Sequence, residues 1–315
     1  MPTTDEQIQA AVKKYRNWGK WGPNDQLGTL NYITADKVVE AARMVRSGKV
    51  ISMALPFDSN GPQTGAWGRV NPVHGFVLTG TDAAAGAQEG MPHGIGAADD
   101  FVSMFLQCGT QWDALSHIYD YGKMWNGYSA AKVTSRGAEL NGIEHMSNRI
   151  VSRGVLLDIA RYKKVDYLKP GYAITEDDLT GCARAQDVKI GRGDIVIVRT
   201  GFLGYCRTNG WGTFSAGDAP GLSFYTADWI WRTEIAGIAS DTWGCEVRPN
   251  ELADAFQPLH QVMIPNIGLL VGEIFDLEPI GEDCAADKVY EFMFVAPALP
   301  ITGAVGSPVN PQAIK

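Results

Sequence analysis

A short polar segment in the first half of the chain carries residue types that can hold a metal ion. Between Gln107 and His117 it contains two carboxamides, a carboxylate and an imidazole around a Gly-Thr turn. It follows the apolar run 101–106, and burying so many polar groups without partners would be costly. Asp113 and His117 are four residues apart, so they share one face if the segment is helical and can still converge if it is a loop. A metal ion or a polar substrate would supply the missing partners.

The donor types favour some cations over others. Carboxylates and imidazoles are standard ligands of Zn²⁺ and Mn²⁺, whereas amide oxygens are neutral donors that suit harder cations. If Gln107 and Gln111 are ligands, their amides would bind zinc more weakly than imidazoles would. They would also shift the preference of the site towards Mn²⁺ or a similar ion. The alternative is that Asp113 caps a turn and that His117 is a hydrogen-bonded core histidine, since an isolated Asp-x-x-x-His does not decide between the two.

A second candidate segment lies near the C-terminal end of the chain. Glu273 comes soon after the apolar run 267–271, and His260 precedes that run. A carboxylate at the edge of a buried run must be paired or must bind a cation. The alternative interpretation is that His260 ends a surface helix and that Glu273 is solvated.

The two segments resemble the metal-site pattern of the cyclase family, the metal-dependent hydrolases that include bacterial kynurenine formamidase and isatin hydrolase. The first segment is similar to the signature His-x-Gly-Thr-His-x-Asp-x-x-x-His, with Gln in place of its first two histidines. The second matches a His followed about a dozen residues later by a Glu at a strand end. Further similar segments follow in the correct order over nearly the whole chain, at 18–33, 153–158, 193–201, 240–242 and 300–311.

The resemblance implies a site and a reaction. One divalent ion, Mn²⁺ or Zn²⁺, would be held by Gln107, Gln111, Asp113, His260 and Glu273. His117 would serve as general acid/base, because an imidazole titrates near neutrality. The expected substrate is a cyclic amide, imide or lactone, or an N-formyl amine, opened by metal-activated water. Relatives of this kind also imply a homodimer or a homotetramer.

Tryptophan is abundant, with nine residues, and several lie in loops that contain Gly or Pro. Aromatic side chains beside a polar site can form a flat-sided pocket for a ring-shaped substrate. Trp67, Trp112 and Trp243 are the candidates for this role, and Trp112 is favoured because it lies inside the signature. Alternatively, these side chains close a core or an oligomer interface.

Two other functions remain open on the sequence. The two Gln replacements could have emptied the metal site and left a ligand-binding or structural relative. Cys108 could act as a nucleophile with His117 as its base, although strand alternation could equally point the thiol into the core. Dinucleotide-binding, P-loop and Gly-x-Ser-x-Gly motifs are absent from the sequence, which disfavours those enzyme classes.

Composition indicates a soluble globular enzyme. The chain has 315 residues, 45% hydrophobic and 20% charged, with a net charge of −8. Its charges form no basic stripe, so a nucleic-acid partner is not expected. Five cysteines without a Cys-x-x-Cys pair argue against a disulfide framework and favour the cytoplasm. A secretory signal and an apolar run of about 18 residues are both missing, so no membrane span is expected.

The element pattern predicts one mixed α/β domain over residues 1–315. The expected helices lie at 5–17, 36–47, 175–185, 227–234 and within 252–263. The expected strands lie at 49–55, 76–79, 101–107, 153–159, 194–199, 238–241, 267–271 and 292–296, and residues 81–100 are predicted to be a surface loop. The absence of regular βαβ alternation favours a mixed sheet. The resemblance adds a swivelling β/β/α fold, with a mixed barrel-like sheet and peripheral helices.

Overall fold

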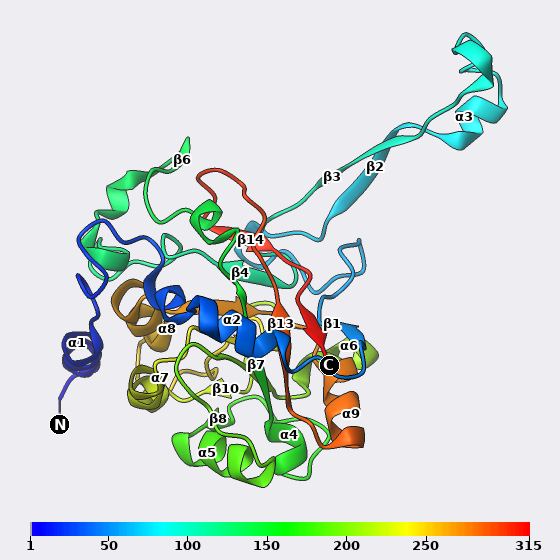
Figure 1. Cartoon of the computed structure of the whole chain (residues 1–315). Coiled ribbons are helices and arrows are strands. Elements are labelled where there is room, and N and C mark those ends of the chain that lie inside the picture. Colours follow the sequence, from blue (N-terminus) through cyan, green and yellow to red (C-terminus); the bar gives the residue numbers. More distant parts are fainter. Residues whose placement is uncertain (1) are drawn as a thin grey trace.

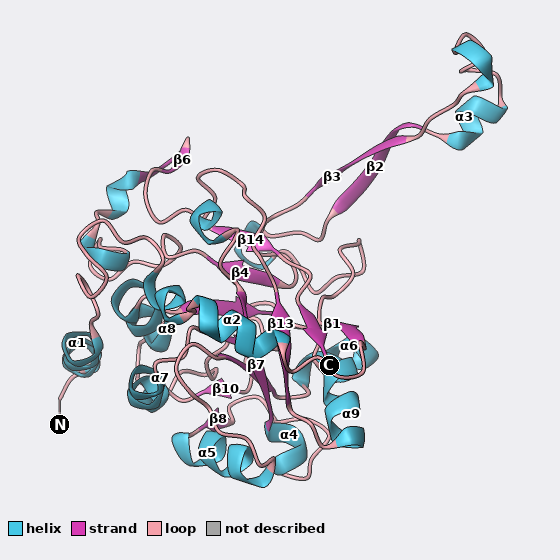
Figure 2. Cartoon of the chain, in the orientation of Figure 1, coloured by secondary structure: helices cyan, strands magenta, loops and turns pink. Residues whose placement is uncertain are grey.

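The computed structural model describes residues 2–315, and a mixed sheet of nine strands forms its centre (Figure 1, Figure 2). The sheet curls as a half-barrel and carries helices on its outside, as predicted. Its spatial order is β1 (Val50–Ser52), β15 (Gln312–Ile314), β13 (Glu291–Val295), β7 (Val151–Asp158), β9 (Ile195–Arg199), β11 (Gly237–Ser240), β12 (Leu270–Glu273), β4 (Gln111–Asp113) and β14 (Gly306–Pro308).

Four parallel strands, β7, β9, β11 and β12, occupy the middle of this sheet, and antiparallel strands flank them on both sides. Parallel strands are covered on both faces and therefore read as continuous apolar runs. The run Ile-Val-Ile-Val of β9 follows this rule, and every residue of the strand is buried. The predicted strands at 153–159 and 194–199 are confirmed by β7 and β9.

The helices are short and lie mostly around the sheet (Figure 2). They are α1 (Thr4–Tyr15), α2 (Ala35–Ala42), α3 (Gly80–Ala84), α4 (Ile159–Tyr162), α5 (Glu176–Ala185), α6 (Phe202–Asn209), α7 (Ala227–Thr233), α8 (Pro258–Val262) and α9 (Glu278–Asp287). Helix α5 begins with the capping box that Thr175 and Asp178 predict. Helix α2 ends earlier than expected, at Ala42, and further along the chain the backbone amides of Ser47 and Gly48 donate to the carbonyl of Lys315.

An arm of the chain projects from the body of the molecule (Figure 1). It is an antiparallel hairpin of β2 (Val73–Leu78) and β3 (Asp99–Ser103), and its tip carries α3. The sequence predicted a strand at 101–107 that would lead directly into the signature, and this prediction is wrong in its extent. The strand ends at Ser103, pairs inside the arm, and is followed by turns before β4 begins at Gln111.

Two smaller ladders complete the fold. Strand β8 (Ala173–Ile174) pairs with β10 (Gly221–Leu222), and β5 (Val133–Thr134) pairs with β6 (Gly137–Ala138). All five cysteines are buried and free. Over residues 2–315, no helix combines the length and apolarity that a bilayer crossing requires. The single-domain organisation and the cytoplasmic location stay predictions.

Candidate metal centre

The pairing of β4 with β12 positions the first part of the site. Glu273 lies opposite Gln111 in the antiparallel register, and Val271 lies opposite Asp113. Directly opposed residues share a face, and successive residues of a strand point to opposite faces. Gln111, Asp113 and Glu273 therefore lie on one face of the sheet, whereas Trp112 points to the other.

Helix α8 carries His260, the residue that contributes the imidazole. Pro258 occupies its first turn, where a missing N–H costs nothing, and the chain continues into a π-helical turn from Met263 to Ile267 before β12. Ligand atoms of Asp113, His260 and Glu273 all lie within 4.8 Å of one another, and all three residues are buried. The two distant segments of the sequence thus meet at one point.

The hydrogen bonds of this cluster leave donor atoms free for a cation. The Nε2 atom of His260 lies 3.1 Å from Oε1 of Glu273, and Nε2 of Gln111 donates to Oε2 of Glu273 at 2.9 Å. In the part of the chain that is described, Oδ1 of Asp113 and Oε1 of Gln111 are buried without a hydrogen-bond partner. Two carboxylates, one imidazole and an unsatisfied amide oxygen are a donor set that fits a divalent ion such as Mn²⁺ or Zn²⁺.

Glu246 orients the imidazole, and the sequence interpretation missed it. Its Oε1 atom lies 2.6 Å from Nδ1 of His260 and accepts the backbone N–H of the same residue at 2.9 Å. Its Oε2 atom accepts the backbone N–H of Leu259 at 3.1 Å. A carboxylate on the far nitrogen of a ligating histidine fixes the ring orientation and raises its basicity. The sequence shows only an acidic residue between Cys245 and Val247. Nothing in that pattern indicates that the side chain of His260 contacts it.

Replacing Glu246 with glutamine is expected to lower the affinity for a divalent ion about 10–100-fold, the usual loss when such an outer partner is removed. Isothermal titration with Mn²⁺ or Zn²⁺ measures the change. Glu251→Gln is the matched control, because Glu251 also accepts hydrogen bonds, from the hydroxyl of Ser223 and the backbone N–H of Phe224, but does not contact His260. Equal metal affinities for the two variants would show that Glu246 does not position His260.

Burial and charge change the pKa values of the cluster. Burial, together with the nearby charge of Asp113, raises the pKa of Glu273 to about 7. Burial lowers the pKa of His260, but the hydrogen bonds to Glu246 and Glu273 outweigh it and raise the pKa to about 10. Burial lowers the pKa of His117, against an opposing effect of Asp113. A neutral His117 can accept a proton, and the excess of carboxylates around His260 favours a cation.

A cavity of about 260 Å³ opens beside the cluster. Asp113, His260 and Glu273 all line it, and so does His117. The remaining lining residues are Trp67, Arg69, Ile118, Trp243, Phe256 and Gln257. The structure therefore brings Trp67, Trp243 and His117 to the same cavity, and the substrate-binding and catalytic roles expected of them stay predictions.

The cavity is also lined by residues that no sequence pattern indicated. Arg69 precedes the arm and lies at the cavity, where its charge acts on His117 and Glu273. Phe256 packs against Trp67 with 5.3 Å between ring centroids. These residues come from loops whose path depends on the tertiary fold, so their convergence has no local pattern.

Trp112 does not form a wall of the substrate pocket, although the sequence predicted that it would. Its side chain is fully buried, its Nε1 donates to the carbonyl of Ala296 at 2.9 Å, and its ring packs edge-on against Phe275. Gly272, opposite Trp112 in the register, leaves room for the ring. The prediction that Trp112 binds substrate is wrong because strand alternation turns it away from Asp113 into the core.

Gln107 and Cys108, two further residues of the signature, do not line the cavity. Gln107 is buried against Gly306 of β14, with its Nε2 lacking a partner, and it makes no hydrogen bond to the described cluster. Cys108 is buried, and burial raises the pKa of its thiol to about 11. A thiol nucleophile needs an accessible thiolate, so the alternative of catalysis by Cys108 is disfavoured. Coordination by Gln107 stays a prediction.

The molecule has a curled mixed sheet, and two carboxylates and an imidazole meet beside a cavity. It is therefore an α/β protein with a candidate metal centre. Within that class the chain belongs to the cyclase family. Its residues 33–247, more than half of the chain, match the family model described as "Putative cyclase". A crystal structure described as a novel cyclase is 40% identical, with a TM-score of 0.89, and the alignment covers 96% of this chain and 100% of that one.

More distant structures share the fold alone. Isatin hydrolase A from Labrenzia aggregata, bound to benzyl benzoate, is 16% identical with a TM-score of 0.60 over 88% of this chain and 97% of its own. A predicted metal-dependent hydrolase from Bacillus stearothermophilus is 17% identical with a TM-score of 0.54 over 84% and 97%. No curated protein matches the chain. The fold is thus that of the metal-dependent hydrolases of the cyclase family.

Proposed function

We propose that this protein is a metal-dependent hydrolase that opens a cyclic amide, imide or lactone, or cleaves an N-formyl amide. The observation that carries the proposal is the buried cluster of Asp113, His260 and Glu273, with His117 on the wall of the same cavity. Structural neighbours with the same fold include isatin hydrolases and metal-dependent hydrolases.

Asp113, His260 and Glu273 would hold one divalent ion, Mn²⁺ or Zn²⁺, and the free amide oxygen of Gln111 lies next to them. When bound, such an ion lowers the pKa of a water molecule and polarises a substrate carbonyl. The chain's own contribution is to fix the geometry: Gln111 holds Glu273 through its amide, and Glu246 holds the ring of His260. Gln107 is a further proposed ligand.

His117 is the proposed general acid/base. Its Nε2 lies 3.9 Å from Oδ1 of Asp113, close to the point where the nucleophilic water would approach the cluster. A neutral imidazole at Nε2 can take a proton from that water and return it to the leaving nitrogen or oxygen, which then departs without a negative charge. The lowered pKa of His117 favours this neutral starting form.

The size and the lining of the cavity favour a small, flat substrate. Its volume of about 260 Å³ and the rings of Trp67, Trp243 and Phe256 suit one or two fused rings. Among the described residues that line it, Arg69 is the only Lys or Arg, and it can donate to a carbonyl or carboxylate oxygen of the substrate. One structural neighbour, an isatin hydrolase, is bound to the product analogue thioisatinate.

A homodimer or homotetramer is the proposed assembly. The competing function is a metal-free ligand-binding relative, which the Gln111–Glu273 hydrogen bond favours, because it would satisfy Glu273 in part without an ion.

The experiment is metal analysis of protein purified without added metal, followed by a hydrolysis screen of lactones, cyclic imides, isatin-type lactams and formamides with Mn²⁺ and Zn²⁺ present. We expect about one ion per chain in the folded protein and an activity that a chelator removes and added metal restores. A metal content near zero that neither ion raises would instead establish the ligand-binding alternative.

A further inference from the structure

Arg69, on the lining of the cavity beside the candidate metal centre, is a shielded arginine without a partner. Its side chain is half-buried, and within residues 2–315 its guanidinium makes no hydrogen bond, ion pair or ring stacking. Three other arginines are shielded from solvent, and each has a partner. Arg153 and Arg199 pair with carboxylates at 3.2 and 2.8 Å, and the guanidinium of Arg248 lies 4.9 Å from the ring centroid of Phe256. Every remaining arginine in this part of the chain is exposed.

The loop that carries Arg69 is tied to the metal-binding signature. The backbone N–H of Arg69 closes the short helical turn Ala66–Gly68. Two residues further on, the side chain of Asn71 donates to the carbonyl of Gln63 at 3.1 Å, and Nε2 of Gln63 donates to the carbonyl of Cys108 at 2.8 Å. Because Cys108 lies inside the signature, these hydrogen bonds hold the loop of Arg69 beside the cluster.

The carboxylates of the cavity cannot neutralise Arg69 once they hold an ion. Asp113 and Glu273 are the proposed ligands of that ion, and no other acidic residue is among the described residues that line the cavity. The charge of Arg69 acts on His117 and on Glu273, so it lies within electrostatic range of the reacting groups. A substrate that fills the cavity removes water from the guanidinium, and a shielded charge without a counter-charge is costly. An anionic group on the substrate would supply that counter-charge.

We propose that Arg69 binds a carboxylate substituent of the substrate and thereby selects it. The inference rests on the proposed function and narrows its substrate class to lactones, lactams or cyclic imides whose ring system carries a carboxylate. The ring lies against Trp67 and Phe256, which pack on each other at the same cavity, and the bond to be hydrolysed lies at the cluster. A guanidinium donates two parallel N–H bonds to one carboxylate, a match that a neutral carbonyl does not offer.

A carboxylate suits this cavity better than a phosphate does. A phosphate would bring more negative charge beside Asp113 and Glu273, and its sites commonly add backbone N–H groups of a helix N-terminus to the cationic side chains. Among the described lining residues, Arg69 is the single Lys or Arg. A planar anion with one charge therefore matches the one guanidinium.

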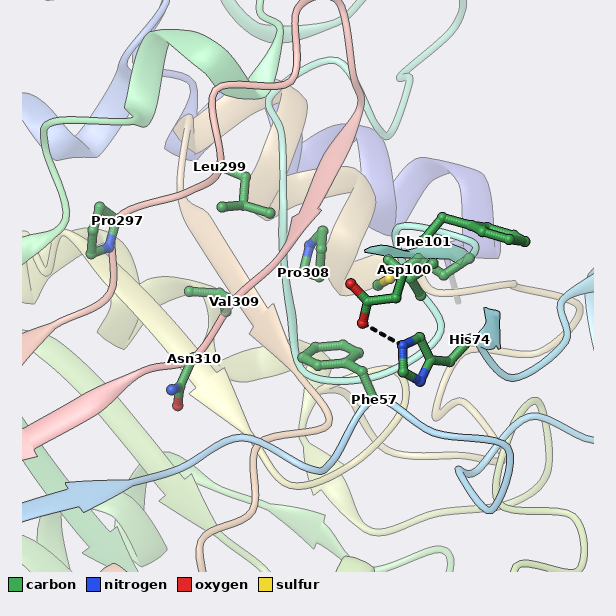
Figure 3. A pocket seen from close by; sticks show the side chains of 11 residues that line it. Phe57, His74, Asp100, Phe101, Pro297, Leu299, Pro308, Val309 and Asn310 are labelled. Carbon is green, nitrogen blue, oxygen red and sulfur yellow. Dashed lines mark hydrogen bonds and ion pairs between the residues drawn. The ribbon is translucent and has the colours of Figure 1, made fainter. Parts of the chain in front are cut away.

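A larger cavity at the base of the arm has no free cation of this kind. Its volume is about 640 Å³, and much of its lining is apolar, with Phe57, Phe101 and Leu299. Its charged residues, His74 and Asp100, pair with each other at 2.7 Å (Figure 3). A carboxylate whose binding depends on Arg69 therefore reports on the cavity beside the cluster.

The first test measures binding to the metal-free protein, in which turnover is not expected. Isothermal titration compares phthalimide-4-carboxylate with phthalimide-4-carboxamide, which differ in the group offered to Arg69 and share the ring. We expect the wild type to bind the carboxylate about 10–100-fold more tightly, the range for hydrogen bonds to a charged partner. Arg69→Gln should weaken the binding of the carboxylate alone and so remove the preference.

Arg136→Gln is the matched control, since Arg136 is exposed, does not line the cavity and forms no ion pair with the described residues. Arg69→Gln is expected to keep the wild-type Tm, because its guanidinium has no partner to lose. Equal affinities of the wild type for the two compounds, no measurable binding of the carboxylate, or an equal loss for both compounds in Arg69→Gln would overturn the proposal.

The second test uses the metal-loaded protein and separates substrate selection from the chemical step. For the carboxylate, Arg69→Gln should raise KM about 10–100-fold with little change in kcat, whereas the kinetics of the carboxamide stay unchanged. Arg69→Lys keeps the charge but not the paired donors, so it should retain part of the preference. A fall in kcat for both compounds would contradict the proposal, because Arg69 would then act at the bond being broken.

The two tests also distinguish this inference from the proposed hydrolase function. If neither compound is hydrolysed with Mn²⁺ or Zn²⁺, but the metal-free protein prefers the carboxylate and Arg69→Gln removes that preference, the binding role of Arg69 is supported and hydrolysis of such rings is refuted. If both compounds are hydrolysed without any preference for the carboxylate, the hydrolase function stands and the inference about Arg69 is wrong.

Discussion

Replacing Asp113 with asparagine is expected to abolish hydrolysis and to weaken metal binding by more than about 100-fold, because losing a ligand costs more than the 10–100-fold that outer partners typically cost. The side chain keeps its size, and only the charge of a ligand oxygen is lost. Since Oδ1 of Asp113 has no hydrogen-bond partner in the described structure and Glu273 lies nearby, the carboxylate is poorly compensated without a cation. The Tm of the metal-free variant is therefore expected to stay equal to that of the wild type or to rise.

Thermal unfolding with and without metal separates this outcome from simple misfolding. An ion at 100 times its dissociation constant stabilises the wild type by about 2.7 kcal/mol, whereas a 100-fold weaker site gains only about 0.4 kcal/mol at the same concentration. Asp194→Asn is the control for a buried carboxylate that already has partners, Arg153 and Lys37. It should lower Tm and leave the metal affinity unchanged. If Asp113→Asn destabilises the metal-free protein and binds metal normally, Asp113 is a structural residue.

The central strands could be predicted from local pattern. The apolar runs of β7 and β9 are long enough, and buried enough on both faces, to leave one interpretation. The same holds for helix α5, where a capping box marks the start. The prediction of a strand at 101–107 was wrong in its extent. An apolar run indicates that its side chains are buried, but it does not show which part of the molecule covers them. Phe101 and Val102 remain 52% and 54% exposed on the arm, where one chain offers them no cover.

Some residues of the candidate site could also be predicted from the sequence, and others could not. Asp113, His260 and Glu273 could be selected because buried acids and imidazoles need partners, and the fold brings them within 4.8 Å. Trp112 could not be placed, because a difference of one residue in a strand reverses the face, and the sequence did not show that β4 begins at Gln111. Glu246 and Arg69 could not be selected at all, since each acts through a loop that approaches the site only in the folded chain.

The same geometry supports our proposal for the preferred ion. Gln111 turns its amide nitrogen to Glu273 and leaves its oxygen free, so the cluster offers a neutral oxygen donor where the family signature has an imidazole. Oxygen donors favour Mn²⁺ over Zn²⁺ relative to an all-histidine set. The role that we propose for His117, by contrast, depends on proton transfer and not on coordination, so an experiment can separate it from metal binding.

Replacing His117 with glutamine is expected to lower kcat about 10²–10⁴-fold, the contribution of a positioned general acid/base, while the metal affinity changes little. Glutamine can still hydrogen-bond in the cavity but cannot carry a proton between water and the leaving group. The readouts are kcat on the best substrate of the screen and metal stoichiometry of the purified variant. The loss should shrink for substrates with a better leaving group, because they need less protonation.

His145→Gln serves as the control, since His145 is exposed and does not line the cavity. If His117→Gln loses metal together with activity, His117 is a ligand and another group must move the proton. If it retains wild-type kcat for every leaving group, the imidazole has no part in the chemistry. Only a fall in kcat that depends on the leaving group, at full metal content, fits an imidazole 3.9 Å from Asp113 that transfers protons beside the ion and does not bind it.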